Sequence, residues 1–102
     1  MTSPEVSIVI PCLNEEKTIL SLLESILNQT FPVAKLEVVI ADGLSDDKTR
    51  QIIADFQQKH PEMKIWVLDN PARRIPTGLN IAIRAAGGEI LTRMDAHAIP
   101  AA

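Results

Sequence analysis

The hydrophobic residues of this chain gather in four short runs, separated by segments with helical spacing. The runs are nearly all apolar and rich in β-branched residues, as expected of strands covered on both faces; they occupy residues 6–10, 36–41, 64–68 and 89–94. In the intervening segments, apolar residues recur three and four positions apart, as on the buried side of a helix. Because each gap between strands has room for one helix, the pattern predicts right-handed βαβ crossovers and a parallel sheet.

Capping and breaking residues indicate where the helices begin and end. Asn14 and Ser45 are good N-caps, and each is followed by two acidic residues that suit the positive end of a helix. We expect the first helix to run from Asn14 to about Gln29, and the second from Ser45 to His60. Pro76 opens a shorter third helix, which a pair of glycines closes.

Each predicted strand is followed at once by residues able to bind a nucleotide or a metal. These clusters are residues 11–16, 42–47, 69–74 and 95–97. The carboxyl ends of parallel strands share one edge of a sheet, and ligands of open α/β sheets bind at that edge. The sequence therefore predicts half of an enzyme site there.

Composition narrows the choice of ligand. With 102 residues the chain has room for one domain, and its net charge of −3 gives no basic footprint for nucleic acid. The one cysteine, Cys12, excludes an internal disulfide and favours a small buried side chain. The sequence has neither a signal peptide nor an apolar run of membrane-spanning length, so we expect a soluble, cytoplasmic protein.

Two common phosphate-binding patterns, G-x-G-x-x-G and G-x-x-x-x-G-K-[ST], do not occur in the sequence. The predicted edge carries carboxylates instead, at Asp42, Asp46, Asp47 and Asp95. Bare carboxylates repel a diphosphate, whereas a bound divalent cation reverses that repulsion.

Four motifs in this order resemble the N-terminal half of a glycosyltransferase family 2 domain of GT-A fold. They are VSIVIPCLNEE at 6–16, VVIADGLSDDKT at 38–49, GLNIAI at 78–83 and MDAH at 94–97. The resemblance implies a truncated GT-A domain with a Rossmann-like, three-layer α/β/α architecture and a parallel sheet of about four strands in the order 3-2-1-4. It places the first two helices on one face and the third on the other, and it makes Asp95 and Pro11 neighbours across the ligand crevice.

The resemblance also implies a nucleoside diphosphate sugar as the donor, with UDP as the expected nucleotide. Pro11 and Asn14 match the loop that lines the nucleotide pocket in the family. Asp42 matches the aspartate that meets the base, where a carboxylate can accept the N3–H of uracil; the alternative is a turn former before Gly43. Arg73 or Arg74 could fork onto the diphosphate or remain a solvated loop charge.

Asp95-Ala96-His97 matches the D-x-D signature of the family, in which carboxylates contact the ribose and a metal ion. His97 replaces the second carboxylate, so we expect Asp95 and His97 to bind a divalent cation, with Mn²⁺ favoured over Mg²⁺ by the imidazole. The alternative for His97 is an exposed loop histidine. For Asp46 and Asp47 we expect a helix-stabilising, water-facing role.

Residues 1–102 are thus interpreted as the donor-binding half of a metal-dependent, inverting glycosyltransferase whose acceptor is a saccharide or a lipid. The sequence after His97 offers no general base, so we expect the isolated chain to bind donor without turnover. The full-length protein could work at the inner face of the membrane. Two alternatives are a non-catalytic nucleotide-binding or regulatory α/β module and a receiver-like domain, although the latter needs a lysine after a late strand that is absent.

The last predicted strand, residues 89–94, would present an unpaired edge, and a single short helix would shield one face of the sheet. Arg93 is the one charge on residues 90–94 that opposes association there. We therefore expect a homo-oligomer that buries this strand or the thinly covered face.

Overall fold

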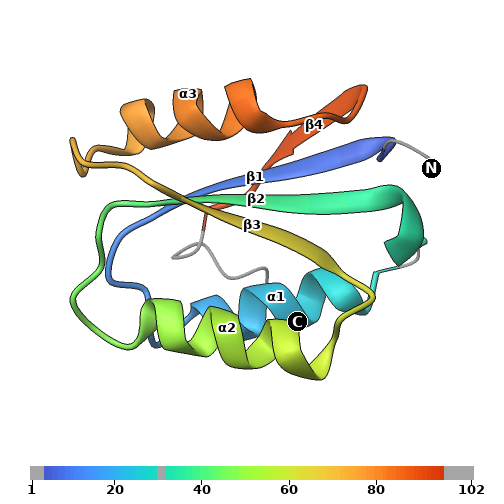
Figure 1. Cartoon of the computed structure of the whole chain (residues 1–102), viewed down its shortest axis with the longest axis horizontal. Helices are drawn as coiled ribbons and strands as arrows, with labels where there is room; N and C mark the ends of the chain where they lie inside the picture. Colours follow the sequence, from blue (N-terminus) through green and yellow to red (C-terminus); the bar gives the residue numbers. More distant parts are fainter. Residues whose placement is uncertain (1–3, 30–31, 96–102) are drawn as a thin grey trace.

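The chain folds into three layers, with a four-stranded sheet between one helix and a pair of helices (Figure 1). The computed structural model describes residues 4–29 and 32–95. In chain order the elements are β1 (Val6–Cys12), α1 (Ile19–Leu27), the 3₁₀ helix η1 (Val33–Lys35), β2 (Leu36–Asp42), α2 (Thr49–Lys59), β3 (Lys64–Asp69), α3 (Ile75–Ala85) and β4 (Ile90–Arg93).

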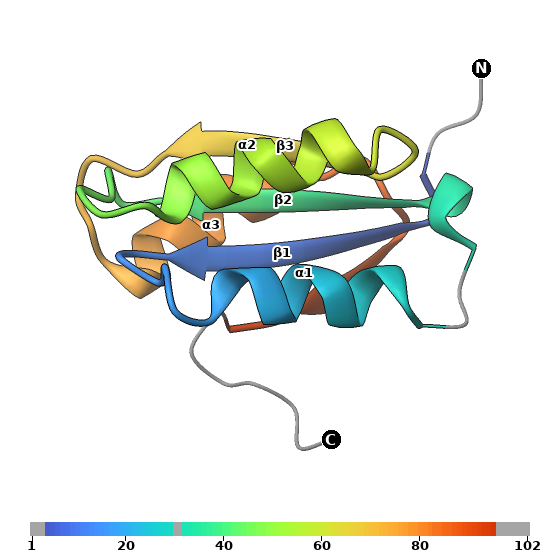
Figure 2. The same cartoon turned by 90° about the horizontal axis from the view of Figure 1, so that it is seen from below.

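All strand pairs are parallel, and the strand order is β3-β2-β1-β4, as predicted. Helices α1 and α2 cover one face of the sheet and α3 covers the other (Figures 1 and 2), which confirms the predicted layers. The register places Cys12 beside Asp42 and Asp42 beside Asp69. The last residues of β1, β2 and β3 therefore lie side by side at the carboxyl edge.

The core is unequal on the two faces of the sheet. The face under α1 and α2 carries the larger cluster, which includes Ile8, Ile10 and Ile40 from the strands and Leu23 and Ile53 from the helices. The cluster of buried hydrophobic residues under α3 is smaller and consists of Val9, Val39, Ala41 and Ala82. Every residue of β2 is buried, as expected of a central strand.

The first two helices begin later than the sequence predicted. Helix α1 starts at Ile19 rather than directly after Asn14, and α2 starts at Thr49 rather than directly after Ser45. Asn14 adopts a left-handed backbone with φ 52°. The polar side chains of both loops bond across to the other loop, so they do not act as N-caps.

A buried hydrogen-bond network fixes the start of β4 against β1. The Glu37 carboxylate accepts bonds from the Ser7 hydroxyl at 2.7 Å, the Gly87 N–H at 2.7 Å and the Trp66 indole N–H at 3.0 Å. Ser7 in turn accepts the Gly88 N–H at 2.8 Å. The network sets the path of the chain into β4, and so the position of the residues that follow that strand.

Candidate functional site

The loops after β1 and β2 are joined by reciprocal hydrogen bonds at the carboxyl edge. The Asn14 N–H donates to Ser45 Oγ at 2.8 Å, and the Asp46 N–H donates back to Asn14 Oδ1 at 3.0 Å. The Glu16 N–H likewise donates to the Asp47 carboxylate at 3.3 Å, and the Lys48 N–H donates to the Glu16 carboxylate at 3.0 Å. The two loops therefore form one unit.

Asp47 has a more specific role than the water-facing one predicted. Its Oδ1 accepts the Thr49 N–H at 2.9 Å and the Thr49 hydroxyl at 2.6 Å, at the start of α2. Burial would raise the pKa of this carboxyl, but the bonds from Thr49 and from the Glu16 N–H lower it. Asp46 is exposed, as predicted.

Asp42 lies at the centre of the edge, at the end of β2, and is fully buried. Its carboxylate accepts bonds from the Ser45 N–H at 2.9 Å, the Ser45 hydroxyl, Arg50 Nε at 2.6 Å and Cys12 Sγ at 3.3 Å. Burial by itself would raise the pKa of Asp42, but the bonds from Ser45 and Arg50 hold it below its ordinary value. In this arrangement the carboxylate is ionised, and a base could reach it only by displacing one of these donors.

Arg50, which the sequence reasoning missed, bridges the ends of β2 and β3. Its Nε donates to Asp42, and its Nη2 donates to Asp69 Oδ1 at 2.6 Å. The side chain is 41% exposed, so the bridge lies at the surface of the edge. The signal in the sequence was an arginine near the start of the helix that connects one strand-end aspartate to the next strand.

Cys12 is a packing residue, as predicted. Its thiol is buried and donates to Asp42. Burial, together with the negative charge of Asp42, raises the pKa of the thiol well above its ordinary range. The neutral thiol is a poor nucleophile.

The loop after β3 is anchored by Asn70, which the sequence placed in the cluster at 69–74 but to which it gave no role of its own. Asn70 is buried; its N–H donates to the Asp42 carbonyl at 2.8 Å, and its Nδ2 donates to the Arg74 carbonyl at 2.9 Å. Arg73 closes a turn onto the Asn70 carbonyl at 3.0 Å and has a left-handed φ of 58°. Both arginines are exposed at this edge, as an anion-binding role requires.

Close packing explains two glycines near this loop. A Cβ on Gly78 would lie 2.8 Å from Asn70 Nδ2, and one on Gly43 would lie 3.2 Å from the Arg73 Cα. Gly78 thus lets α3 approach Asn70 and the buried Pro11, whose Cβ would be 3.4 Å away. The arrangement supports a packing role for Gly78.

Asp95 follows β4 and is partly exposed. Its carboxylate pairs with Arg93 Nε at 3.1 Å, and the Met94 N–H donates to the Val9 carbonyl at 3.1 Å. The register pairs Val9 with Arg93, and Pro11 and Asp95 each lie two residues further along the chain. His97 lies outside the described residues.

The described part of the edge offers a hollow and no cluster of metal-ligating side chains. Among residues 4–29 and 32–95, no three His, Cys, Asp or Glu side chains come together as a metal site. A hollow of about 540 Å³ opens beside the joined loops, lined by residues 14–18, Asp46 and Asp47. No helix within these ranges is long and apolar enough to cross a bilayer.

Comparison with known proteins points to one family. The family model described as glycosyl transferase family 2 matches residues 7–102. A relative from Methanococcus voltae is 39% identical over 95 residues, which cover 93% of this chain and 30% of the relative. It is named a dolichyl N-acetyl-α-D-glucosaminyl phosphate 3-β-D-2,3-diacetamido-2,3-dideoxy-β-D-glucuronosyltransferase. The chain thus spans about a third of that relative's length.

Solved structures agree with this match. A mannosyltransferase from Pyrobaculum calidifontis, in complex with GDP-Man and Mn²⁺, superposes with a TM-score of 0.88 at 33% identity, over 99% of this chain and 30% of that one. S. aureus TarS with UDP-GlcNAc superposes with a TM-score of 0.75 at 29% identity, over 90% of this chain and 26% of that one.

Proposed function

The chain belongs to glycosyl transferase family 2, and from that premise we propose that it is the donor-binding part of a metal-dependent, inverting glycosyltransferase. The proposed donor is a nucleoside diphosphate sugar, with UDP as the nucleotide, and the proposed acceptor is a saccharide or a lipid. The observation that carries the proposal is the single edge at which the β1, β2 and β3 loops are bonded together beside two exposed arginines.

We assign the nucleoside to the carboxyl edge at Pro11, Asn14 and Asp42, where Asn14 is exposed and the other two are buried. The Asp42 carboxylate is ionised and can accept a base N–H if Ser45 or Arg50 yields its bond. Asp69 gives Arg50 a second acceptor, so the guanidinium keeps a partner when it leaves Asp42. This exchange explains how a saturated carboxylate can still read a base.

We assign the diphosphate to Arg73 and Arg74 and the cation to Asp95 with His97. Arginine guanidinium groups fit phosphate oxygens in a fork geometry. A cation bound here would neutralise the diphosphate beside the carboxylates of the edge. Asp95 and His97 give only two protein ligands, so we expect the diphosphate to complete the coordination shell, and imidazole favours Mn²⁺ over Mg²⁺.

We further propose that the full-length protein acts on the cytoplasmic side, at the inner face of the membrane, and that the chain self-associates. Both proposals concern the protein outside the donor edge. They leave the assignment of the nucleotide unchanged.

Isothermal titration calorimetry of this chain with UDP and GDP, with and without Mn²⁺, tests the function. We expect UDP to bind, and Asp42→Ala to weaken binding at least about tenfold, because a lost charged hydrogen bond costs roughly 1.5–3 kcal/mol. Asp55→Ala, an exposed change on α2, is the matched control and should bind like the parent. Equal affinity of Asp42→Ala and the parent would reject the role of Asp42, and no binding of either nucleotide would reject the proposed function.

A further inference from the structure

Strand β3 forms one outer edge of the sheet, and its outward backbone groups are partly unsatisfied. The Asn70 N–H donates to the Asp42 carbonyl of β2, whereas the Ile65 N–H points away from β2 to the Gln57 side chain at 3.1 Å. Since backbone groups alternate along a strand, Val67 and Asp69 also face outward. Within the described part of the chain, no protein group accepts their N–H bonds.

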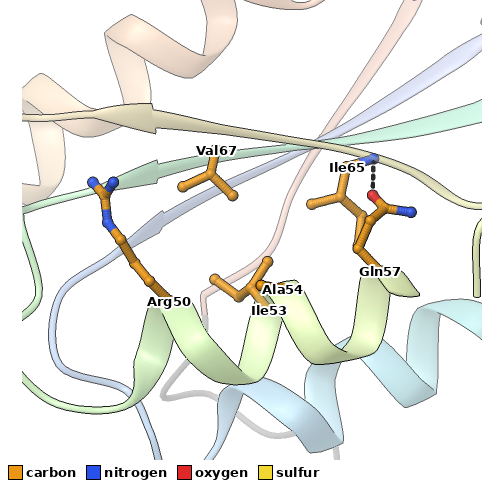
Figure 3. Close-up of a pocket in the computed structure, with 6 residues that line it drawn as sticks. All are labelled: Arg50, Ile53, Ala54, Gln57, Ile65 and Val67. Carbon is orange, nitrogen blue, oxygen red and sulfur yellow. Dashed lines mark hydrogen bonds between the residues drawn. The ribbon is translucent and has the colours of Figure 1, made fainter. Parts of the chain in front are cut away.

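Gln57 covers only the beginning of this edge. Its Oε1 accepts from the Ile65 N–H (Figure 3), and its Nε2 donates to the Met63 carbonyl at 2.6 Å. Beyond Ile65, Val67 faces an open notch of about 270 Å³ between α2 and β3, whose walls are Ile53, Ala54 and the stem of Arg50. The unprotected part of the edge is therefore centred on Val67.

Apolar surface lies on both sides of β3. Trp66 is 54% exposed and Val67 is 37% exposed, on opposite faces of the strand. On the α3 side a second hollow, of about 310 Å³, is lined by Trp66, Leu68, Ala85 and the Glu37 carboxylate. A strand added to this edge would place alternate side chains in the two hollows.

We propose that the occupant is a second copy of this chain, paired antiparallel through β3 with Val67 opposite Val67. A two-fold axis normal to the sheet keeps corresponding faces together. It places Trp66 of each copy beside Leu68 of the other, on the side where both residues line the α3 hollow. Val67 then meets Val67 over the α2 notch.

This register gives partners to the outward groups that lack them. The two Val67 residues exchange both backbone hydrogen bonds, and the Asp69 N–H of each copy donates to the Ile65 carbonyl of the other. The Asp69 carbonyl of the other copy then faces the Ile65 N–H, so it replaces Gln57 Oε1 as the acceptor of that bond. In each copy one side-chain bond is thus exchanged for a backbone bond.

Symmetry selects the antiparallel direction. A two-fold axis normal to the sheet reverses the second β3 and keeps the α3 sides of both copies together. The charges at the strand ends do not oppose this direction, because Asp69 is already paired with Arg50 and Lys64 lies on the other face of the strand. The result is a symmetric dimer with a continuous sheet.

Sedimentation equilibrium at protein concentrations up to roughly 100 µM tests the interface. We expect the parent chain to dimerise, and Val67→Lys to weaken the dimer at least about tenfold, because it places two like charges at the two-fold axis. Leu20→Lys, a residue of α1 that is 43% exposed, is the matched control and should dimerise like the parent. Circular dichroism melting checks that both variants fold.

Leu91→Lys, a change on β4, distinguishes a dimer formed through β3 from one formed through β4. A dimer lost in Leu91→Lys but kept in Val67→Lys would overturn the proposal, as would a parent chain that is monomeric at the highest concentration. A Val67→Cys variant gives an independent measurement, since cysteines facing each other at the axis should form an intermolecular disulfide under mild oxidation. Absence of that crosslink in a folded variant would also contradict the register.

Discussion

The Asp42 carboxylate is completely buried and accepts bonds from Ser45 and Arg50. These bonds favour its ionised form, so its ionisation contributes to the free energy of folding. Its pKa in the folded chain lies below that of the unfolded chain, which is about 3.9. The stabilisation is therefore complete at neutral pH and is lost as the pH falls below about 4 toward the folded-state pKa.

Removing Arg50 should shift this acid transition. Arg50→Met keeps the aliphatic stem but removes a hydrogen bond that lowers the pKa of Asp42, so acid unfolding should begin at a higher pH than in the parent. Fluorescence of Trp66, the one tryptophan in the sequence, measures the transition against pH. Arg84→Met, a change on the exposed side of α3, is the control; an unchanged acid midpoint in Arg50→Met would show that Arg50 does not support the Asp42 charge.

At His97, too, a single side chain has a proposed effect, which is the preference for manganese. With only Asp95 and His97 as protein ligands, the ion should bind poorly alone and much better with a nucleoside diphosphate. His97→Ala should therefore reduce Mn²⁺-dependent nucleotide affinity and leave metal-independent affinity unchanged. His60→Ala serves as the control histidine, and Mn²⁺-dependent binding that survives in His97→Ala would reject this ligand.

The sequence identified candidate site residues that directly follow a predicted strand. It did not identify the contacts of residues whose role depends on tertiary structure. Asp42 was predictable because a carboxylate directly after a buried strand must lie at the edge. Arg50 and Asn70 were not, because their partners depend on the register of β2 against β3 and on the direction of α2. Neither can be derived from local spacing.

Among the elements, the strands and the start of the third helix were predicted to within two residues, and the starts of the first two helices were not. A continuous run of apolar, β-branched residues indicates a strand locally, whereas the side chains of Asn14 and Ser45 had two possible sets of partners. Across the loops they bond to each other and to Asp42, so the capping position passes to Thr18 in α1 and Lys48 in α2. A tertiary contact thus overrides the local preference.

Asn14 allows a test of how strongly this loop pair stabilises the fold. Asn14→Ala loses the acceptor for the Asp46 N–H and keeps a Cβ at φ 52°, where a left-handed backbone costs roughly 1–2 kcal/mol. Asn14→Gly loses the same acceptor without that strain. In urea unfolding we expect Asn14→Ala to be the less stable of the two by about 1 kcal/mol. Equal stabilities would show that the loop relaxes its backbone when the side chain is lost.

At the scale of the whole molecule, the sheet is well covered on one face and thinly covered on the other. The small cluster under α3 is supplemented by the polar network of Glu37, which joins β2 to Ser7 of β1, Trp66 of β3 and the turn at Gly87 before β4. Strand β4 is exposed along its whole length, so it depends on that network as well as on its pairing with β1. The same network therefore sets the position of Asp95 at the far end of β4.

Glu37→Gln should expose this dependence. Both carboxylate oxygens accept hydrogen bonds from the protein, and a carboxamide must turn its NH₂ toward at least one of those donors. We expect a loss of roughly 1–3 kcal/mol in unfolding free energy, with amide exchange at Ile90 and Met94 accelerating more than exchange in the buried centre of β2. Glu24→Gln, an exposed change on α1, should alter neither measurement. Uniform acceleration through all four strands would instead show that Glu37 stabilises the fold as a whole, and that β4 has no separate dependence on it.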